Sequence, residues 1–167
     1  MKILIVLPVY NEELVLKKNA KKVLVFCREN FQGDEFKIVI SDNNSNDQTA
    51  EIGRRLKEEF PEIDYLFINR KGKGLAIKSA WQRFDAEVYC FMDADLATDL
   101  GALPALVGAI DAGNDVAYGS RFHSLSKVER PFFRRFISTV YQILVKLFFS
   151  SKINDAPCGF KAISRRV

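Results

Sequence analysis

Short apolar segments alternate with longer segments of helical periodicity over the first two-thirds of the chain, and this alternation constrains the fold most. The apolar segments, each without a polar face, are residues 3–9, 37–41, 65–69, 88–92 and 115–119. Helical spacing of apolar residues marks 12–30, 47–60 and 74–84, and a further helix is expected through Leu103 and Ala109. Apolar strands separated by helices are typical of a parallel sheet covered on both faces, so we predict an α/β fold with a mostly parallel central sheet.

The composition is that of one folded domain, 1–167. Of the 167 residues, 48% are hydrophobic and 28% are charged, with only 9 glycines and 5 prolines. These values exclude a disordered or linker-dominated chain. No segment reaches the ~18 uninterrupted apolar residues of a membrane-spanning helix.

The three cysteines, Cys27, Cys90 and Cys158, are far apart and match no metal-ligand spacing. Because His123 is the sole histidine, the pattern argues against a Cys/His zinc site. We therefore predict a reducing compartment and buried or idle thiols. Packing is the favoured role for Cys158, since no histidine is placed in the sequence to activate it as a nucleophile.

The net charge of +4 is small, but it is unevenly distributed. From Arg121 to the C-terminus lysine and arginine are frequent, and the acidic residues are Glu129 and Asp155 alone. This pattern predicts a local basic face that would suit an anionic partner.

Polar or charged residues follow each predicted strand. Ligands of parallel sheets bind at the carboxyl ends of the strands, so these segments together form the candidate site. The segments are Pro8-Val9-Tyr10-Asn11-Glu12, residues 42–47, residues 70–74, Asp93-Ala94-Asp95 and Gly119-Ser120-Arg121.

Asp93 and Asp95 place two carboxylates one residue apart on a turn that leaves an apolar strand. Such a pair suits a shared hard cation whose other positions are filled by phosphate oxygens. The alternative is helix capping by Asp95 or Asp99. We favour the metal site, because clustered anions beside a buried strand need compensating charge.

Asp42 also ends an apolar strand, where a carboxylate suits a nucleobase edge or a ribose hydroxyl. The alternative is turn formation, with Ser45 or Asp47 capping the next helix. We expect both within this loop: Asn43 to Asp47 shape the turn, and Asp42 is the ligand candidate.

The segment Arg70-Lys71-Gly72-Lys73-Gly74 combines glycines, which permit close backbone approach, with positively charged side chains. It suits a diphosphate, although it is not a Walker A sequence. A solvated basic turn is an equally good interpretation. In the first segment, Asn11 and Glu12 have the alternative role of starting the first helix.

Residues 130–151 combine a broad apolar arc with Arg134, Arg135 and Lys146. An interfacial membrane helix and a core helix that packs against a missing partner fit this pattern about equally well.

Together these residues resemble family 2 glycosyltransferases of the GT-A fold, a Rossmann-like three-layer architecture. The resemblance extends from residues 8–12 to Cys158-Gly159-Phe160-Lys161. Within the family the chain is most similar to the polyprenyl-phosphate hexose synthases, on residues 119–121, 134–138 and 155–161. Residues 47–49, 93–98 and 158–161 look more like the dolichyl-phosphate glucose branch than the mannose branch. Many mannose-branch relatives have Gln where this chain has Ala97.

The resemblance implies specific roles for site residues. Asp95 would hold Mg²⁺ or Mn²⁺, which bridges the diphosphate of UDP-glucose or GDP-mannose, and Asp93 would contact either this metal or the ribose. Donor contacts are implied for Pro8, Tyr10, Asn11, Glu12, Asp42, Lys73, Asp93 and Ala94. The acceptor phosphate would be held by Arg121, one of Arg134 or Arg135, and Ser138. Asp95 and these arginines would carry the catalysis.

The implied reaction is inverting transfer of a hexose to a polyprenyl or dolichyl phosphate. The acceptor phosphate is already largely ionised at neutral pH, because its second pKa lies near ~6, so no dedicated general base is needed. The protein would act at the cytoplasmic face of a membrane, peripherally or through segments beyond this chain, with no nucleic-acid partner. Because relatives continue beyond Val167, we expect a catalytic domain that is either truncated or unusually short.

Two other functions fit the sequence. One is transfer to a sugar or protein hydroxyl, for which Asp155 would serve as the base that an attacking alcohol requires. The other is a nucleotide-sugar-binding module without turnover.

Overall fold

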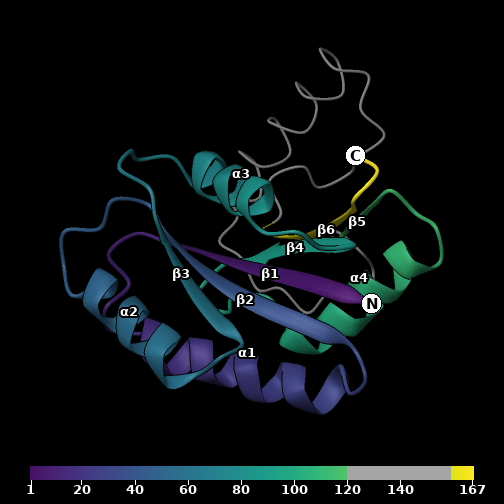
Figure 1. Cartoon of the computed structure of the whole chain (residues 1–167), viewed down its shortest axis with the longest axis horizontal. Helices are drawn as coiled ribbons and strands as arrows, with labels where there is room; N and C mark the ends of the chain where they lie inside the picture. The colour runs from purple at the N-terminus through teal and green to yellow at the C-terminus, as the bar shows by residue number, and fades with distance from the viewer. Residues whose placement is uncertain (120–158) are drawn as a thin grey trace, which may run out of the picture.

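The fold is built on a six-stranded sheet with the strand order β3-β2-β1-β4-β6-β5 (Figure 1). The computed structural model describes residues 1–119 and 159–167. The strands are β1 (Lys2–Val9), β2 (Glu35–Asp42), β3 (Ile63–Phe67), β4 (Val88–Met92), β5 (Val116–Tyr118) and β6 (Phe160–Ser164). The predicted mixed α/β architecture with a mostly parallel sheet is confirmed.

The parallel part of the sheet is centred on β1, which pairs with β2 on one side and β4 on the other. Because β2 also pairs in parallel with β3, four consecutive strands have their carboxyl ends at the same edge. The register places Val9 opposite Asp42, so the last residues of β1 and β2 lie side by side. Strand β6 runs antiparallel between β4 and β5.

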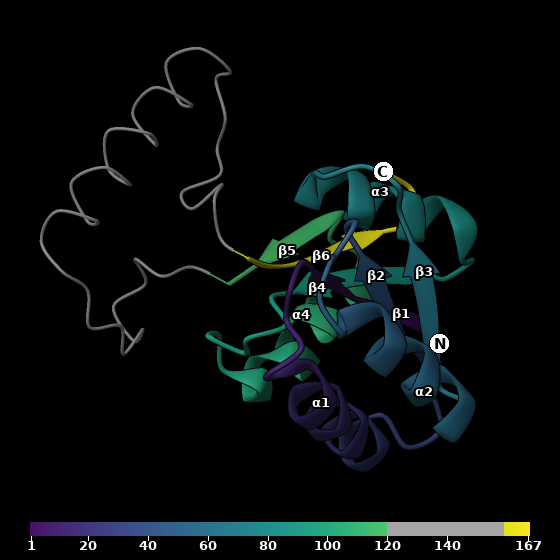
Figure 2. The same ribbon diagram turned by 90° about the vertical axis from the view of Figure 1, so that its left-hand side faces the viewer.

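Helices cover both faces of the sheet and make three layers (Figures 1 and 2). Alternate residues of β1, from Ile3 to Val9, pack with α1 (Leu16–Asn30), α2 (Thr49–Glu59) and α4 (Leu103–Asp111). The residues between them, Leu4 and Val6, pack with α3 (Lys73–Arg83) on the other face. A short 3₁₀ helix, Leu100–Ala102, leads into α4. This alternation explains why the central strands are apolar on both faces.

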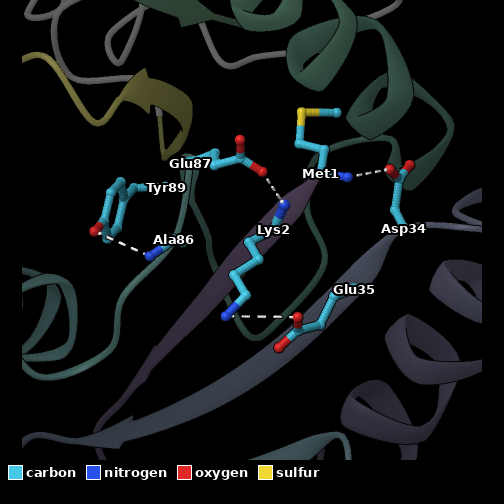
Figure 3. A network of polar contacts seen from close by, with 7 residues as sticks. All are labelled: Met1, Lys2, Asp34, Glu35, Ala86, Glu87 and Tyr89. Atoms are coloured by element: carbon cyan, nitrogen blue, oxygen red, sulfur yellow. Dashed lines mark hydrogen bonds and ion pairs between the residues drawn. The ribbon is translucent and has the colours of Figure 1, made fainter.

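The first residues of the chain are tied to both neighbouring strands at the amino ends of the sheet (Figure 3). The Met1 ammonium donates to Asp34 at 2.9 Å, and this bond is the main reason that the pKa of the ammonium is raised. The Lys2 N–H donates to Glu87 at 2.6 Å, and Lys2 Nζ lies 3.6 Å from Glu35. These contacts anchor β1 at the end opposite the candidate site.

Several predicted boundaries differ from the structure. The first helix begins at Leu16 rather than at residue 12, because residues 13–15 form a turn in which the Glu12 carbonyl accepts the N–H groups of Val15 and Leu16. Strand β3 was expected at 65–69 and spans Ile63–Phe67, since Ile63 pairs with Ile38.

The outer strands are less buried than the sequence predicts. β3 and β5 are the sheet edges, so they are only partly covered: Phe67 and Val116 are exposed, and these strands are not apolar on both faces. Strand β6 was not predicted. Its alternating burial from Phe160 to Ser164 is typical of a strand, but residues 158–161 had been interpreted as a motif only.

Two cysteines lie within the described residues, and both are buried in the core that includes α1 and β4. Burial raises the pKa of the Cys27 and Cys90 thiols to about 12, so each is protonated at neutral pH. The expectation of buried thiols is confirmed for these two, while Cys158 lies outside the described residues. Within residues 1–119 and 159–167, no helix has the length and hydropathy that crossing a bilayer would require.

Gly53 on α2 tests the packing of that helix on β3. A Cβ at this position would lie 2.4 Å from a Tyr65 ring carbon, whereas one at Gly108 on α4 would meet no atom within 4 Å. We expect Gly53→Ala to lower the free energy of unfolding by about 1–3 kcal/mol through overpacking. Gly108→Ala should raise it by roughly 0.5–1 kcal/mol, as alanine does in a helix. Urea unfolding followed by circular dichroism measures both; equal effects would contradict the tight packing at Tyr65.

Candidate functional site

A polar cavity of about 220 Å³ opens where β1, β2 and β4 end. It brings together most of the strand-end residues that the sequence singled out. The lining residues are Pro8, Val9, Tyr10, Glu12, Asn43, Lys73, Asp93, Ala94 and Asp95. A larger hollow of about 810 Å³ lies between α1 and residues 96–101, but Asp93 and Asp95 do not line it. The smaller cavity is therefore the candidate site.

The turn Asp93-Ala94-Asp95 leaves β4 at the cavity. Asp93 forms an ion pair with Lys73 through Oδ1. Asp95 is exposed, and its Oδ1 accepts the N–H of Ala97 at 3.0 Å. Capping of the next helical segment is performed by Asp99, which accepts the Gly101 N–H at 2.9 Å. The capping alternative thus holds for Asp99 and leaves the carboxylates of Asp93 and Asp95 at the cavity.

The basic turn of residues 70–74 lies against the same cavity. The Gly72 N–H donates to Asn43 Oδ1 at 2.6 Å. Lys71 donates to the hydroxyl of Tyr10 and lies 4.6 Å from the centre of its ring. Lys73 contacts Asp93 and lies 5.9 Å from the ring centre of Phe91. The turn is exposed yet joined to β1, β2 and β4 through these contacts, so it is more than a solvated surface turn.

The Glu12 carboxyl lies in a partly buried and negatively charged part of the site. The Glu12 backbone N–H donates to Thr49 Oγ1 at 2.8 Å, and its carbonyl accepts the N–H groups of Val15 and Leu16 in the turn that leads into α1. The alternative role at the start of the first helix therefore holds for the Glu12 backbone, although α1 itself begins at Leu16. Burial raises the pKa of the Glu12 carboxyl, and the charges of Asp95, Asp47 and Asp93 raise it further. A cation or a proton in the cavity would relieve this repulsion.

Asp42 and Asn11 lie beside the cavity and do not line it. Asp42 is fully buried, and its two oxygens accept the Ser45 N–H at 2.9 Å and the Tyr65 hydroxyl at 2.6 Å. Asn11 adopts a left-handed φ of 55° and accepts the Asn46 N–H. Both residues hold the loop after β2. For Asp42 this is the turn-forming role that the sequence left open beside ligand contact, whereas for Asn11 the alternative considered was the start of the first helix.

Asn43 was interpreted only as a turn residue, yet it lines the cavity and holds the basic turn. Its place directly after Asp42 at the sheet edge was the available signal, and the turn preference of asparagine obscured it. Asp47, by contrast, accepts the Thr49 N–H at 2.9 Å beside the start of α2, although the N-cap position of that helix is occupied by Gln48.

The predicted acceptor residues, Arg121, Arg134, Arg135 and Ser138, lie outside the described residues, as do Ser120, His123, Asp155 and the amphipathic segment 130–151. Their placement relative to the cavity stays a prediction.

The donor set in the cavity fits a hard divalent cation. In the described part of the chain, no group of three or more Cys, His, Asp or Glu side chains is arranged to hold a metal. Asp93 and Asp95 nevertheless supply two carboxylates to the cavity, and Glu12 lines it beside them. Mg²⁺ is commonly held by one or two carboxylates with substrate phosphates and water as the other ligands. The pair fits that kind of site.

Comparison with known proteins defines the class. The sequence profile of Glycosyl transferase family 2 matches residues 4–167, and the chain belongs to this family. Glycosyltransferase AglD of Haloferax volcanii is 37% identical over 164 residues, which cover 96% of this chain and 26% of the relative.

Two further relatives share 30% identity with this chain. Dolichol-phosphate mannosyltransferase of Pyrococcus furiosus matches over 100% of the chain and 47% of its own length. Dolichyl-phosphate beta-glucosyltransferase ALG5A of Trichomonas vaginalis matches over 96% of the chain and 52% of its own length. The chain thus spans about half the length of these two relatives and about a quarter of AglD.

Solved structures support the GT-A fold. Mannosyltransferase PcManGT from Pyrobaculum calidifontis, in complex with GDP-Man and Mn²⁺, superposes with a TM-score of 0.63 at 20% identity, over 98% of this chain and 44% of that one. Glucosyl-3-phosphoglycerate synthase from Mycobacterium tuberculosis, in complex with Mn²⁺, UDP and phosphoglyceric acid, gives a TM-score of 0.72 at 17% identity, over 99% and 56%. The fold implied by the sequence motifs is therefore confirmed.

The environment of Glu12 predicts a pH-dependent effect on stability. The pKa of Glu12 is higher in the folded protein than its ordinary value of 4.5, so the ionised carboxylate lowers the free energy of unfolding. This destabilisation increases as the pH rises from 4.5 through the pKa of the folded protein. We expect Glu12→Gln to have a higher Tm than the wild-type protein at pH 7 and a similar one at pH 4. Thermal unfolding of both proteins across this range measures the difference.

Glu58→Gln is the control, because Glu58 is exposed on α2 and lies outside the cavity. It should change Tm little at either pH. A lower Tm of Glu12→Gln at pH 7 would show that the carboxylate is stabilising and would contradict the excess of negative charge.

Proposed function

We propose that this chain is the catalytic domain of an enzyme that transfers a hexose from a nucleotide sugar to a polyprenyl phosphate, with Mg²⁺ or Mn²⁺ as cofactor. The main support for this proposal is the cavity in which the carboxylates of Asp93 and Asp95 lie beside the ammonium of Lys73. Paired carboxylates suit a cation and lysines suit a diphosphate, and a nucleotide sugar with its metal presents both. The relatives named for dolichol-phosphate substrates support this acceptor class.

On the donor side, the proposal assigns the diphosphate to the basic turn and the cation to Asp93 and Asp95. The ion pair between Lys73 and Asp93 would then separate, so that Lys73 faces phosphate oxygens while Asp93 faces the cation. Tyr10 is 37% exposed at the mouth of the cavity and offers a ring face to the nucleoside, beside Pro8 and Ala94. Asp42, Asn11 and Glu12 would position these contacts through the loop and the start of α1.

The bound cation would supply charge that stabilises the departing nucleoside diphosphate. The acceptor phosphate is an anion at neutral pH and attacks the anomeric carbon directly in a single in-line displacement that inverts its configuration. No side chain is required to remove a proton from it. The task of the protein is then to bring two anionic groups together, through Lys73 on one side and through Arg121, one of Arg134 or Arg135, and Ser138 on the other.

We favour glucose over mannose as the transferred sugar, on residues 47–49, 93–98 and 158–161. The enzyme would work at the cytoplasmic face of a membrane, where a polyprenyl phosphate presents its headgroup. The amphipathic segment 130–151 and the basic residues after Arg121 are proposed to face that surface.

The direct test incubates the chain with UDP-glucose or GDP-mannose, Mn²⁺ and a short-chain polyprenyl phosphate, and follows prenyl-phosphate hexose by mass spectrometry. We expect product with UDP-glucose in preference to GDP-mannose. Asp95→Asn should reduce the rate by a factor on the order of 10² or more, because a charge that acts on the reacting phosphates is lost.

Asp111→Asn is the matched control, since Asp111 is an exposed aspartate at the end of α4, away from the cavity. Its rate should equal that of the wild-type protein. Glycosylation of hydroxyl acceptors alone would contradict the proposed acceptor, and an Asp95→Asn rate equal to wild type would contradict the role of the carboxylate pair.

A further inference from the structure

The turn that carries Asp93 and Asp95 is hydrogen-bonded to α1. Asn19 lies on this helix, and its Nδ2 donates to the carbonyl oxygen of Ala94 at 2.8 Å. Ala94 is 4% exposed and lies between the two aspartates. A buried carbonyl needs a hydrogen-bond donor, and Asn19 supplies one from an element 75 residues away in sequence. This bond ties the turn to α1.

The same turn is confined on its other side by the start of β6. Met92 pairs with Phe160, so Gly159 lies beside Asp93 across the antiparallel ladder. A Cβ on Gly159 would stand 2.0 Å from Asp93 Oδ2 and 2.7 Å from its Cγ. Only a residue without a side chain allows the Asp93 carboxylate its observed position. The atoms that would clash belong to the end of a short side chain, so substitution would move the carboxylate rather than the strand.

We propose that Asn19 and Gly159 are positioning residues, which hold the Asp93-Ala94-Asp95 turn so that its carboxylates are ready for a divalent cation. Neither residue touches the cavity, and each acts on one part of the turn: Asn19 on its backbone and Gly159 on the Asp93 side chain. Leu96, directly after the turn, has a left-handed φ of 53°, a conformation that a leucine keeps only where its surroundings impose it. The inference rests on the proposed function, because it takes these carboxylates as the cation site.

These two contacts would strengthen cation binding by holding the carboxylates in place before the cation arrives. Two carboxylates bind a cation well when they are already at the correct separation, because no ordering has to accompany binding. In Asn19→Leu the turn loses its hydrogen bond while the side chain keeps a similar size. In Gly159→Ala the Asp93 carboxylate is pushed from its place beside Lys73. Both variants should therefore weaken cation binding while every residue that lines the cavity is retained.

The experiment titrates Mn²⁺ into the full chain in the presence of UDP and follows free Mn²⁺ by electron paramagnetic resonance, at a temperature where circular dichroism shows each variant folded. We expect Asn19→Leu and Gly159→Ala each to raise the Kd for Mn²⁺ about tenfold or more. Asn19→His, which retains an N–H donor at a similar reach, should recover part of the affinity.

Two matched controls separate positioning from general destabilisation. Asn30 lies on the same helix and donates through Nδ2 to the Phe26 carbonyl at 2.9 Å, far from the cavity, so Asn30→Leu removes the same kind of bond. Gly108→Ala adds a methyl group into open space. Both controls should bind Mn²⁺ as the wild-type protein does.

The outcomes distinguish this inference from the proposed function. Wild-type affinity in both Asn19→Leu and Gly159→Ala, or an equal loss in the controls, overturns the positioning role. If Gly159→Ala does not fold, Asn19→Leu and Asn19→His decide the question. If the wild-type chain fails to bind Mn²⁺, or Asp95→Asn binds it equally well, the cation site itself is wrong and the proposed function falls first.

Discussion

The structure depends on the parallel pairing of β1 with both β2 and β4. Parallel neighbours require a crossover, so α1, α2 and α3 must return the chain along the faces of the sheet after each strand. The carboxyl ends of these strands consequently share one edge, and residues from positions 8 to 95 meet around one cavity. The site follows from this topology: three strand ends that are distant in sequence deliver an aromatic ring, an amide and two carboxylates to one place.

Charge balance connects the fold to the proposed chemistry. The cavity gathers Glu12, Asp93 and Asp95, and their mutual repulsion adds to the burial that raises the pKa of Glu12. Lys73 of the basic turn compensates part of this negative charge through its ion pair with Asp93. The Lys71 ammonium lies over the ring of Tyr10. If a cation and a diphosphate bind together, the ion pair between Lys73 and Asp93 would be replaced by two new ones, Asp93 with the cation and Lys73 with the diphosphate. Neither side chain would then be left without an opposite charge. A cavity with this composition is suited to a metal-bound nucleotide sugar.

Local sequence patterns predicted the central fold, because buried strands and helices leave strong periodic signals. β1, β2 and β4 were placed within two residues at each end, as their residues are apolar on both faces. The edge strand β3 was displaced by two residues, because partial burial weakens its pattern, whereas β6 was missed because residues 158–161 were interpreted only as a motif. The aspartates at the ends of β2 and β4 were also predicted, because ligands of a parallel sheet bind at the carboxyl ends of its strands. The supporting contacts of Asn19 and Gly159 were not predicted, since a bond across 75 residues or a missing Cβ leaves no local pattern in the sequence. The contact of Asn43 was missed because its turn preference suggested a simpler role.

In the proposed enzyme, the Asp93-Ala94-Asp95 turn binds a nucleotide-sugar donor together with a divalent cation. Isothermal titration of UDP-glucose into the chain, with Mn²⁺ and again with excess EDTA, measures whether the two ligands bind together. We expect donor binding to be at least about tenfold tighter with Mn²⁺, which is roughly 1.4 kcal/mol of coupling between the two ligands. Equal affinity under the two conditions would contradict it.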